Sequence, residues 1–499
     1  EENDQKALEL FTSASELGNA NAHYWLGVCF YNGYGVKKED EKAYQLYVKA
    51  AEADIADAQL NLGTFFRDGI VVEEDYKKAI GWYEKAVSNG STRAQSLLSE
   101  MYELGLGVEE DLRKSFTGYI AAAEKGDAIA MHSVAEAYQY GNGVEQNMPK
   151  AIEWYEKAAS LGYSQSIYRL GTIYQEGLGV EKNIVQAIEY YNEALGLKDP
   201  WAAYNLGQLY RMGEECPMDM SKAVDYFKYA IDLGLSEAMN TLAIILWVGE
   251  SGFEQNTPEA YRLFKRAAEK GHIEANYNLG ILYHDGICVK QNYEKALEYF
   301  STAANEHHAD AEYYVGLMYK DGLGCEQNEE ESLSWILKAA DDGSPDAQNY
   351  MGNYSFFEEE DYMKDIEWYE KADNNGCVEA ITSLGLMHYN GQGFVKDETK
   401  GIELLALAAE KDDPKAMYNL ANIYTEDEYI NLDKAIYLLN KAIEFDYPDA
   451  YGLLGCMYFT GEGVAEDPVK ARELFLRGAE LGSEDCQEAL KKIEEEYQE

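Results

Sequence analysis

The chain has 499 residues, and its 91 acidic side chains against 42 Lys and Arg give a formal net charge of −49. This charge disfavours nucleic acids and anionic membranes as partners, because both would repel it. No run is long and apolar enough for a transmembrane helix, so the sequence predicts no membrane insertion.

The first predicted element, within residues 1–21, is a helix without a partner. Its Lys6-Ala7 and Ala14 match the second helix of the units that follow, while the first helix of such a unit is missing. We interpret it as an N-terminal half-repeat. It is either a cap or the remainder of a unit whose N-terminal part was removed, and we favour removal.

Residues 22–482 repeat with a period of about 36 residues, which is typical of stacked helix pairs. Position zero of a unit is Ala or Ser, position five is Gly, Ala or Ser throughout, and position eleven is Gly in eleven of thirteen units. The thirteen units start at Ala22, Ala58, Ala94, Ala130, Ser166, Ala202, Ala238, Ala275, Ala311, Ala347, Ala380, Ala416 and Ala450.

Each unit is predicted to hold two helices. Positions zero, four and eight form one buried stripe of the first helix, the small residue at position five lets a neighbouring helix approach, and Gly at position eleven ends the helix. The second helix carries Lys-Ala and a pair of aromatics, as in Lys78-Ala79 and Trp82-Tyr83. The units at Ala347 and Ala416 lack the Gly-x-Gly turn, and a shorter loop between their helices is expected.

Residues 483–499 are predicted to form a lone first helix whose charged tail caps the array. The expected fold is therefore all-α: one continuous right-handed α-solenoid, residues 1–499, of about thirteen stacked helix-turn-helix repeats. The pattern of Ala, Leu-Gly, aromatic and Gly-x-Gly-Val followed by Lys-Ala and paired aromatics resembles the Sel-one-like repeats of the tetratricopeptide superfamily. The resemblance implies a scaffold or adaptor in protein complexes, and it implies neither catalysis nor a particular partner.

In such solenoids the first helices line the concave surface, so positions that point away from the core stripe are candidates for a partner-binding groove. Position two is often Tyr and position three often Asn, which suits an extended peptide. The alternative is that these consensus groups bond neighbouring repeats. The groove candidates are Tyr24, Trp25, Asn61, Tyr168, Arg169, Tyr204, Asn205, Tyr277, Asn278, Tyr313, Tyr314, Tyr350, Tyr418 and Asn419.

Negative charge is concentrated in the second half, where residues 251–499 carry 52 acidic and 21 basic side chains, against 39 and 21 in residues 1–250. Such runs are either a solvated face or a docking surface for a basic segment. The acidic docking candidates are Glu329, Glu330, Glu331, Glu358, Glu359, Glu360 and Asp361.

The seven cysteines are odd in number and irregular in spacing, which argues against a disulfide framework and for a reducing compartment. Cys29 and Cys456 are expected to be small core residues. The sequence thus favours the cytoplasm, with a secreted or periplasmic location after loss of an unseen signal peptide as the alternative.

No catalytic residue, metal site or cofactor is predicted. His272 and His308 are equivalent in adjacent units, but stacked positions are expected about 10 Å apart, too far for a compact metal site. We therefore expect a non-enzymatic protein that holds a protein or peptide segment, basic in character, in its concave groove. The alternative is a secreted or surface protein that recognises a host protein or a glycan. The sequence sets no oligomeric state.

Overall fold

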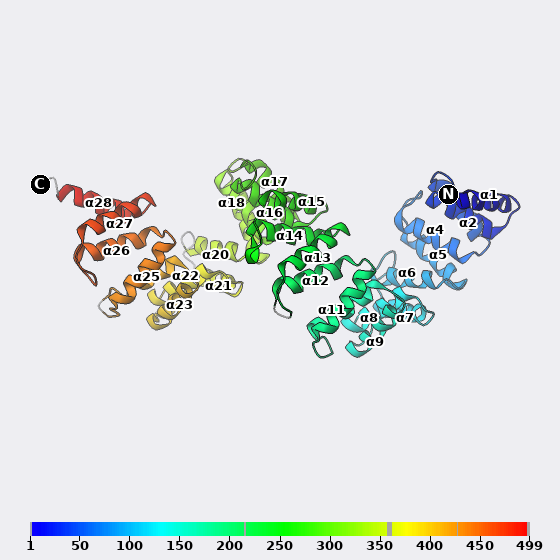
Figure 1. The fold of residues 1–499 in the computed structure, drawn as a ribbon, viewed down its shortest axis with the longest axis horizontal. Coiled ribbons are helices and arrows are strands. Elements are labelled where there is room, and N and C mark those ends of the chain that lie inside the picture. The colour runs from blue at the N-terminus through cyan, green and yellow to red at the C-terminus, as the bar shows by residue number, and fades with distance from the viewer. Residues whose placement is uncertain (1, 214–215, 357–361, 427, 497–499) are drawn as a thin grey trace. The chain divides into compact units, whose positions relative to one another are not determined.

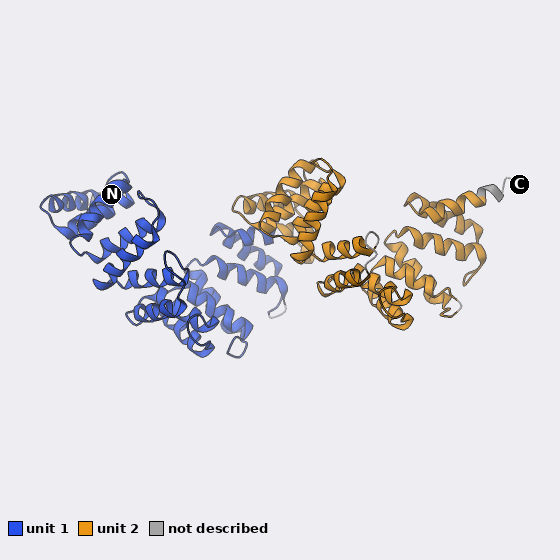
Figure 2. Ribbon diagram, turned by 180° about the vertical axis from the view of Figure 1, so that it is seen from behind, with its two compact units in different colours: residues 1–242 blue, residues 243–499 orange. Residues whose placement is uncertain are grey.

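The computed structural model describes residues 2–213, 216–356, 362–426 and 428–496. This part of the chain consists of helices and turns, with 28 α-helices, one 3₁₀ helix and no strand (Figure 1). The chain forms two compact units, residues 1–242 and 243–499 (Figure 2).

The helices of the first unit follow one another at short, regular intervals. They are α1 (Glu2–Glu16), α2 (Ala20–Asn32), α3 (Asp40–Ala51), α4 (Ala56–Asp68), α5 (Tyr76–Ser88), α6 (Thr92–Glu103), α7 (Leu112–Ala123), α8 (Ala128–Tyr140), α9 (Met148–Ser160), α10 (Ser164–Glu176), α11 (Ile184–Gly196), α12 (Pro200–Met212), α13 (Met220–Asp232) and α14 (Ser236–Val248), which crosses the unit boundary.

The second unit continues the same alternation. Its elements are η1 (Glu250–Gly252), α15 (Thr257–Ala268), α16 (Ile273–Asp285), α17 (Tyr293–Asn305), α18 (Ala309–Asp321), α19 (Glu329–Asp341), α20 (Pro345–Tyr354), α21 (Tyr362–Asn374), α22 (Val378–Asn390), α23 (Glu398–Glu410), α24 (Pro414–Ile423), α25 (Leu432–Glu444), α26 (Pro448–Thr460), α27 (Pro468–Glu480) and α28 (Glu484–Glu496).

Even-numbered helices are the first helices of repeats and odd-numbered ones the second helices. Within each unit a helix packs mainly on the helices before and after it, as in α4 with α3 and α5. Neighbouring pairs stack in series, which is the architecture of an α-solenoid. The predicted all-α solenoid fold is confirmed.

The small residue at position five marks the closest approach within a repeat. The aromatic ring of Tyr83 on α5 lies directly over Gly63 on α4, and a Cβ added at Gly63 would overlap that ring. Leu62 and Phe65 of α4 are buried in the neighbouring core cluster, which they share with Tyr47 of α3. Phe65 is at position seven, which the sequence did not single out and which is apolar and buried in most repeats.

In most repeats the first helix ends at the glycine that the repeat pattern predicts, as in α4. Gly69 follows α4 in the left-handed region at φ 66°, and its N–H donates to the carbonyl of Phe65. At the start of α5, the side chain of Asp75 accepts a hydrogen bond from the N–H of Lys78 at 3.0 Å. These caps fix the turn that connects α4 to α5.

Two expectations were wrong in detail. In the unit that starts at Ala416 the first helix is shortened and not the loop: α24 has 10 residues where most first helices have 13. Cys456 is exposed on α26, whereas Cys29 is buried as expected. All seven cysteines are free.

Candidate functional site

Four consecutive first helices of the first unit, α6, α8, α10 and α12, line a groove of about 1080 Å³. Helix positions two, three and six supply much of its wall, and the turns before the helices supply the rest. These positions recur because successive repeats present the same face. Among the lining residues are Glu100, Glu103, Glu136, Tyr168, Arg169 and Trp201.

Acidic and basic side chains both line this groove. The acidic ones are Glu100, Glu103, Glu136 and Asp199, and the basic ones are Arg93, Arg169 and Lys198. Glu103 accepts a hydrogen bond from the hydroxyl of Tyr119 at 3.0 Å, and burial raises the pKa of Glu103. Glu136 lies 3.5 Å from Nε2 of His132 and 3.7 Å from Nη2 of Arg169. Burial alone would raise the pKa of Glu136, but those two neighbours together lower it.

Aromatic side chains border the same groove. Trp201, at the start of α12, is 40% exposed and contacts Tyr204 edge to face at 5.8 Å between ring centroids. Tyr168 is half-buried, with its ring 6.0 Å from the buried ring of Tyr191. The groove thus combines flat apolar contact area with both acidic and basic groups.

The structure brings Tyr168 and Arg169 into the groove wall, and the other groove candidates lie elsewhere on the first helices. In the first unit, Trp25 is 48% exposed and stacks on Phe11 at 6.1 Å, and Tyr24 and Asn61 are half-buried. The remaining candidates of this unit are Tyr204 and Asn205, both half-buried on α12.

In the second unit four candidates form a continuous aromatic row across α16, α18 and α20. The centroid of Tyr314 lies 5.9 Å from that of Tyr277 and 6.4 Å from that of Tyr313, and Tyr350 follows at 6.3 Å from Tyr313. Burial raises the pKa of Tyr313 to about 12, and the charge of Asp346 adds to this.

The other three candidates of the second unit are not part of this row. Asn278 is buried on α16. Tyr418 is half-buried on α24 against Tyr447, with ring centroids 5.6 Å apart, and Asn419 donates a hydrogen bond to the carbonyl of Lys415 one turn earlier. Asn278 is thus closed to a partner, and Tyr418 and Asn419 are only partly accessible to one.

Several Tyr and Asn side chains bond neighbouring repeats, as the alternative interpretation of the consensus holds. The amide of Asn205 donates to the hydroxyls of Tyr168 at 3.4 Å and Tyr191 at 3.2 Å, both in the preceding repeat. The hydroxyl of Tyr204 lies 3.3 Å from that of Thr241 in the next one. The Tyr and Asn side chains at positions two and three, here called the tyrosine ladder, therefore hold neighbouring repeats together in part. Their role in binding stays a prediction.

Three acidic docking candidates, Glu329, Glu330 and Glu331, form the exposed first turn of α19. Asn328 caps this helix by accepting from the N–H of Glu331, and Glu331 accepts from the indole N–H of Trp335 at 3.1 Å. Carboxylates at a helix N-terminus stabilise the helix through its dipole, which gives these residues a structural role as well. Glu358, Glu359, Glu360 and Asp361 lie outside the described residues.

Sequence reasoning missed a set of hydrogen bonds between the turns of successive repeats. Asp127 caps α8, and it also accepts from the hydroxyl of Ser96 in the preceding repeat at 3.1 Å. In the second unit, the hydroxyl of Ser344 donates in the same way to Asp310, 34 residues earlier in the chain, at 2.8 Å. The signal was present as Ser or Asp three residues before several unit starts, but the bonding partner depends on how the repeats stack.

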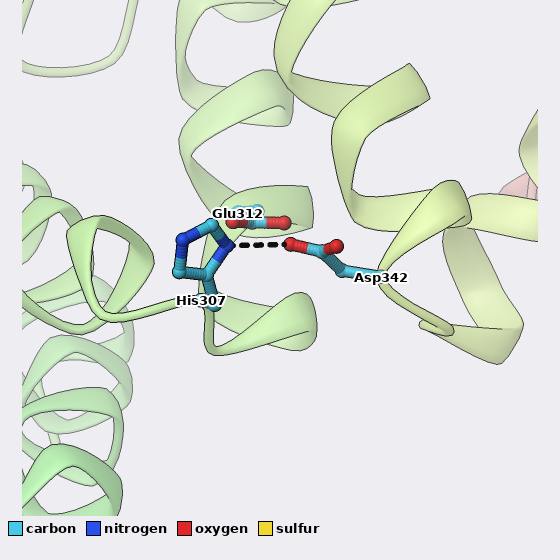
Figure 3. Close-up of side chains that lie close together, drawn as sticks. All are labelled: His307, Glu312 and Asp342. Atoms are coloured by element: carbon cyan, nitrogen blue, oxygen red, sulfur yellow. Dashed lines mark hydrogen bonds and ion pairs between the residues drawn. The ribbon is translucent and has the colours of Figure 1, made fainter. Parts of the chain in front are cut away.

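A second missed cluster joins His307, Glu312 and Asp342, whose potential ligand atoms all lie within 4.8 Å of one another (Figure 3). The separation of about 10 Å expected for His272 and His308 describes helix axes, and side chains that reach across two turns can come much closer than that. Nδ1 of His307 is 3.1 Å from Oδ2 of Asp342, 35 residues further along the chain.

Helix pairs stacked in series, with a groove lined by successive first helices, define a helical repeat protein. The family model described as Sel1 repeat matches the chain in fourteen segments, and the chain belongs to this family. The matched segments are 1–19, 20–55, 56–91, 92–127, 128–163, 164–198, 202–235, 236–272, 273–308, 309–344, 345–376, 378–413, 414–444 and 448–483.

The fold of a solved relative agrees with this assignment. A protective antigen present in uropathogenic Escherichia coli strains, described as displaying an SLR fold, is 29% identical, with a TM-score of 0.53 over 89% of this chain and 96% of its own. A Sel1 repeat protein from Oxalobacter formigenes is also 29% identical, with a TM-score of 0.46 over 50% of this chain and 100% of its own.

Membership of this family confirms the predicted Sel-one-like resemblance and gives the general class of function. Sel1 repeat proteins bind other proteins, and the family is generally non-enzymatic. Among the helices that the structure describes, none is both long and apolar enough to span a membrane.

Proposed function

We propose that the chain is a non-enzymatic scaffold that holds a basic segment of a protein partner in the groove of α6, α8, α10 and α12. The observation that supports this most directly is the set of carboxylates on the groove wall. Glu136 is already paired with Arg169, whereas the nearest cation to Glu100 is Arg67 at 3.9 Å, a distance at which pairing is weak. A Lys or Arg of the partner would pair with Glu100 and Glu103.

The aromatic groups give such a segment a surface to lie on. Trp201 and Tyr168 border the carboxylates, so the aliphatic stem of a Lys or Arg can pack on a ring while its charged end reaches an acid. The row from Tyr277 to Tyr350 offers comparable flat area in the second unit. The net charge of −49 adds long-range attraction for a basic partner.

Peptide binding tests this proposal. Two fluorescent peptides of equal length, one rich in Lys and Arg and one rich in Asp and Glu, are titrated with the full chain, and anisotropy is measured at low and high salt. We expect submicromolar binding of the basic peptide that weakens with salt. Glu100→Gln with Glu103→Gln should weaken it about tenfold, the effect of losing one or two charge-assisted hydrogen bonds.

The matched control changes the same charge outside the groove wall. Glu109→Gln with Glu181→Gln, both in exposed loops, should leave affinity unchanged. If both double variants lose affinity for the basic peptide equally, the effect comes from net charge alone, and the proposal that the groove binds the peptide is wrong. A pull-down from lysate of the source, with Tyr204, Tyr277 and Tyr313 each changed to Ala, tests the tyrosine ladder separately.

A second function, recognition of a host protein or a glycan by a secreted or surface protein, is supported by the likeness to the E. coli protein described as a protective antigen. Protease treatment of intact source cells separates the two. Protection of the chain supports the cytoplasmic scaffold, and cleavage supports the secreted or surface protein.

A further inference from the structure

Three side chains of the second unit converge from two successive turns. His307 lies in the turn between α17 and α18, Glu312 in the first turn of α18, and Asp342 directly after α19. The ligand atoms of the three all lie within 4.8 Å of one another, and Nδ1 of His307 faces Oδ2 of Asp342 at 3.1 Å. Figure 3 shows the carboxylate of Glu312 beside these two facing groups.

Glu312 is the unusual member of this cluster, because it is fully buried. Its Oε1 forms an ion pair with Nζ of Lys338 at 2.7 Å, and its Oε2 has no hydrogen-bond partner. A buried carboxylate oxygen without a partner is costly. Lys338 also donates to the carbonyl of Ala304 at 3.5 Å, and Glu312 is the carboxylate with which it pairs. A cation placed between Glu312 and Asp342 would therefore offset the charge of Asp342 as well.

The spacing suits a small metal ion. Zn²⁺ bonds nitrogen and carboxylate oxygen at about 2.0–2.2 Å, which places tetrahedral ligands about 3.4 Å apart. The separation of 3.1 Å between His307 and Asp342 is close to this, and the other ligand atoms lie within 4.8 Å, so the exposed side chains of His307 and Asp342 would move closer to Glu312 as the ion binds. The side chains of His307 and Asp342 are 74% and 33% exposed, so the ion can enter from solvent.

We propose that His307, Glu312 and Asp342 form a binding site for a divalent transition-metal ion, best Zn²⁺, with a water in the fourth position. The nitrogen ligand favours Zn²⁺ over Mg²⁺ or Ca²⁺, which prefer oxygen ligands. The ion would join the turn before α18 to the end of α19 and so clamp two successive repeats. This site is separate from the peptide groove and does not depend on the proposed function.

Lys338 makes a distinctive prediction possible. Its ammonium occupies one oxygen of Glu312 and repels an incoming cation, so it competes with the metal. Removing His307 should therefore weaken metal binding, while Lys338→Gln should strengthen it. A surface that attracts metal only through its acidity would respond to Lys338→Gln but not to His307→Ala, because this change leaves the acidic charge in place.

Titration calorimetry of the full chain with ZnCl₂, and separately with MgCl₂, tests the site. The buffer contains a phosphine reductant, which keeps the cysteines reduced. We expect one zinc equivalent that is lost, or weakened at least about tenfold, in His307→Ala and Asp342→Asn, and tightened in Lys338→Gln. His284→Ala is the matched control, because His284 also pairs with an Asp, at 2.6 Å, outside the cluster.

Cobalt substitution distinguishes the site from the seven free thiols, since thiolate ligands give an intense charge-transfer band and a His–carboxylate site does not. The proposal is supported if the wild type gives a Co²⁺ spectrum that lacks the thiolate band, and if His307→Ala gives no Co²⁺ spectrum. Zinc binding that is equal in wild type, His307→Ala and Asp342→Asn, or Mg²⁺ binding as tight as Zn²⁺ binding, overturns it. A variant at the buried Glu312 could fail to fold. His307 is exposed, so His307→Ala should fold and still tests the site.

Discussion

Gly63 illustrates at the scale of one residue how the repeat is held together. It sits where α4 comes closest to α5, and the ring of Tyr83 fills the space that a Cβ would need. Tyr83 is fully buried, so it has little room to move away. The consensus glycine at this position is therefore a packing requirement.

Gly63→Ala should destabilise the α4–α5 pair by about 1–3 kcal/mol, the usual cost of overpacking a dense core. Gly81 on α5 is the matched control: a Cβ there meets nothing within 4 Å, and Ala is a better helix former by about 0.5–1 kcal/mol. Amide hydrogen exchange of α4 and α5 measures the change in stability in each of the two variants, Gly63→Ala and Gly81→Ala. Faster exchange in Gly81→Ala, or unchanged exchange in Gly63→Ala, would contradict this account.

A histidine gives the second residue-scale prediction, through its bond to the preceding repeat. Nε2 of His308 is 2.8 Å from Oε2 of Glu274. Burial lowers the pKa of His308, but the hydrogen bond and charge of Glu274 outweigh it and raise that pKa above its ordinary 6.5. Since the folded state holds the proton more tightly, this pair stabilises the fold below pH 6.5, and the stabilisation is lost as pH rises through the raised pKa.

His308→Gln should therefore lower the urea unfolding midpoint more at pH 6 than at pH 8. Glu274→Gln, which removes the other half of the pair, should show the same pattern. Fluorescence-detected unfolding at the two pH values measures the difference. An equal loss at both would mean that the charged pair contributes nothing.

At the scale of an element, each helix start serves its own helix and the neighbouring repeat. Asp127 accepts from the N–H groups of Ile129 and Ala130 at the start of α8, and from Ser96 on α6. One carboxylate thus stabilises a helix and an interface between two repeats. This double use explains why polar caps persist in turns that are partly buried.

Asp127→Ala should destabilise α8 by about 0.5–2 kcal/mol, the range for loss of an N-cap. Ser96→Ala removes only the bond between repeats, so it should cost less, and the double variant should cost less than the sum of the two. Hydrogen exchange of α6 and α8 in the two single variants and the double variant measures the three losses of stability for this double-mutant cycle. Strict additivity would show that the bond from Ser96 contributes no stability.

The elements could largely be predicted from the sequence, while contacts between stacked turns could not. Small residues, aromatics and glycines at fixed positions predict each helix and its end because these constraints are local. The pairing of His307 with Asp342 depends on how two turns stack, which no local pattern records. Of the predicted groove candidates, only Tyr168 and Arg169 line the groove of the first unit, since neighbouring side chains decide which helix positions stay open.

The charge of −49 acts at the scale of the whole molecule. Acidic side chains outnumber basic ones in both halves of the chain, so folding brings like charges together. Salt screens this repulsion, because the Debye length falls from about 30 Å at 0.01 M to about 10 Å at 0.1 M. The partner attraction in the proposed groove is weakened by the same screening.

Thermal unfolding midpoints should rise between about 0.01 M and about 0.1 M salt, a range over which screening becomes effective. NaCl and KCl should act alike if screening is the cause, and scanning fluorimetry can follow both. A midpoint that falls with salt would mean that attractive ion pairs outweigh the net repulsion.

Because a helix pair packs mainly on its immediate neighbours, one repeat can be copied or lost without creating an unfamiliar interface. The near-identical turns are natural crossover points for unequal recombination of the coding sequence. A duplication between them would add a whole helix pair in the correct register. Lineages that carry this architecture are thus expected to differ in the number of repeats, one at a time, more readily than in the packing within any one of them.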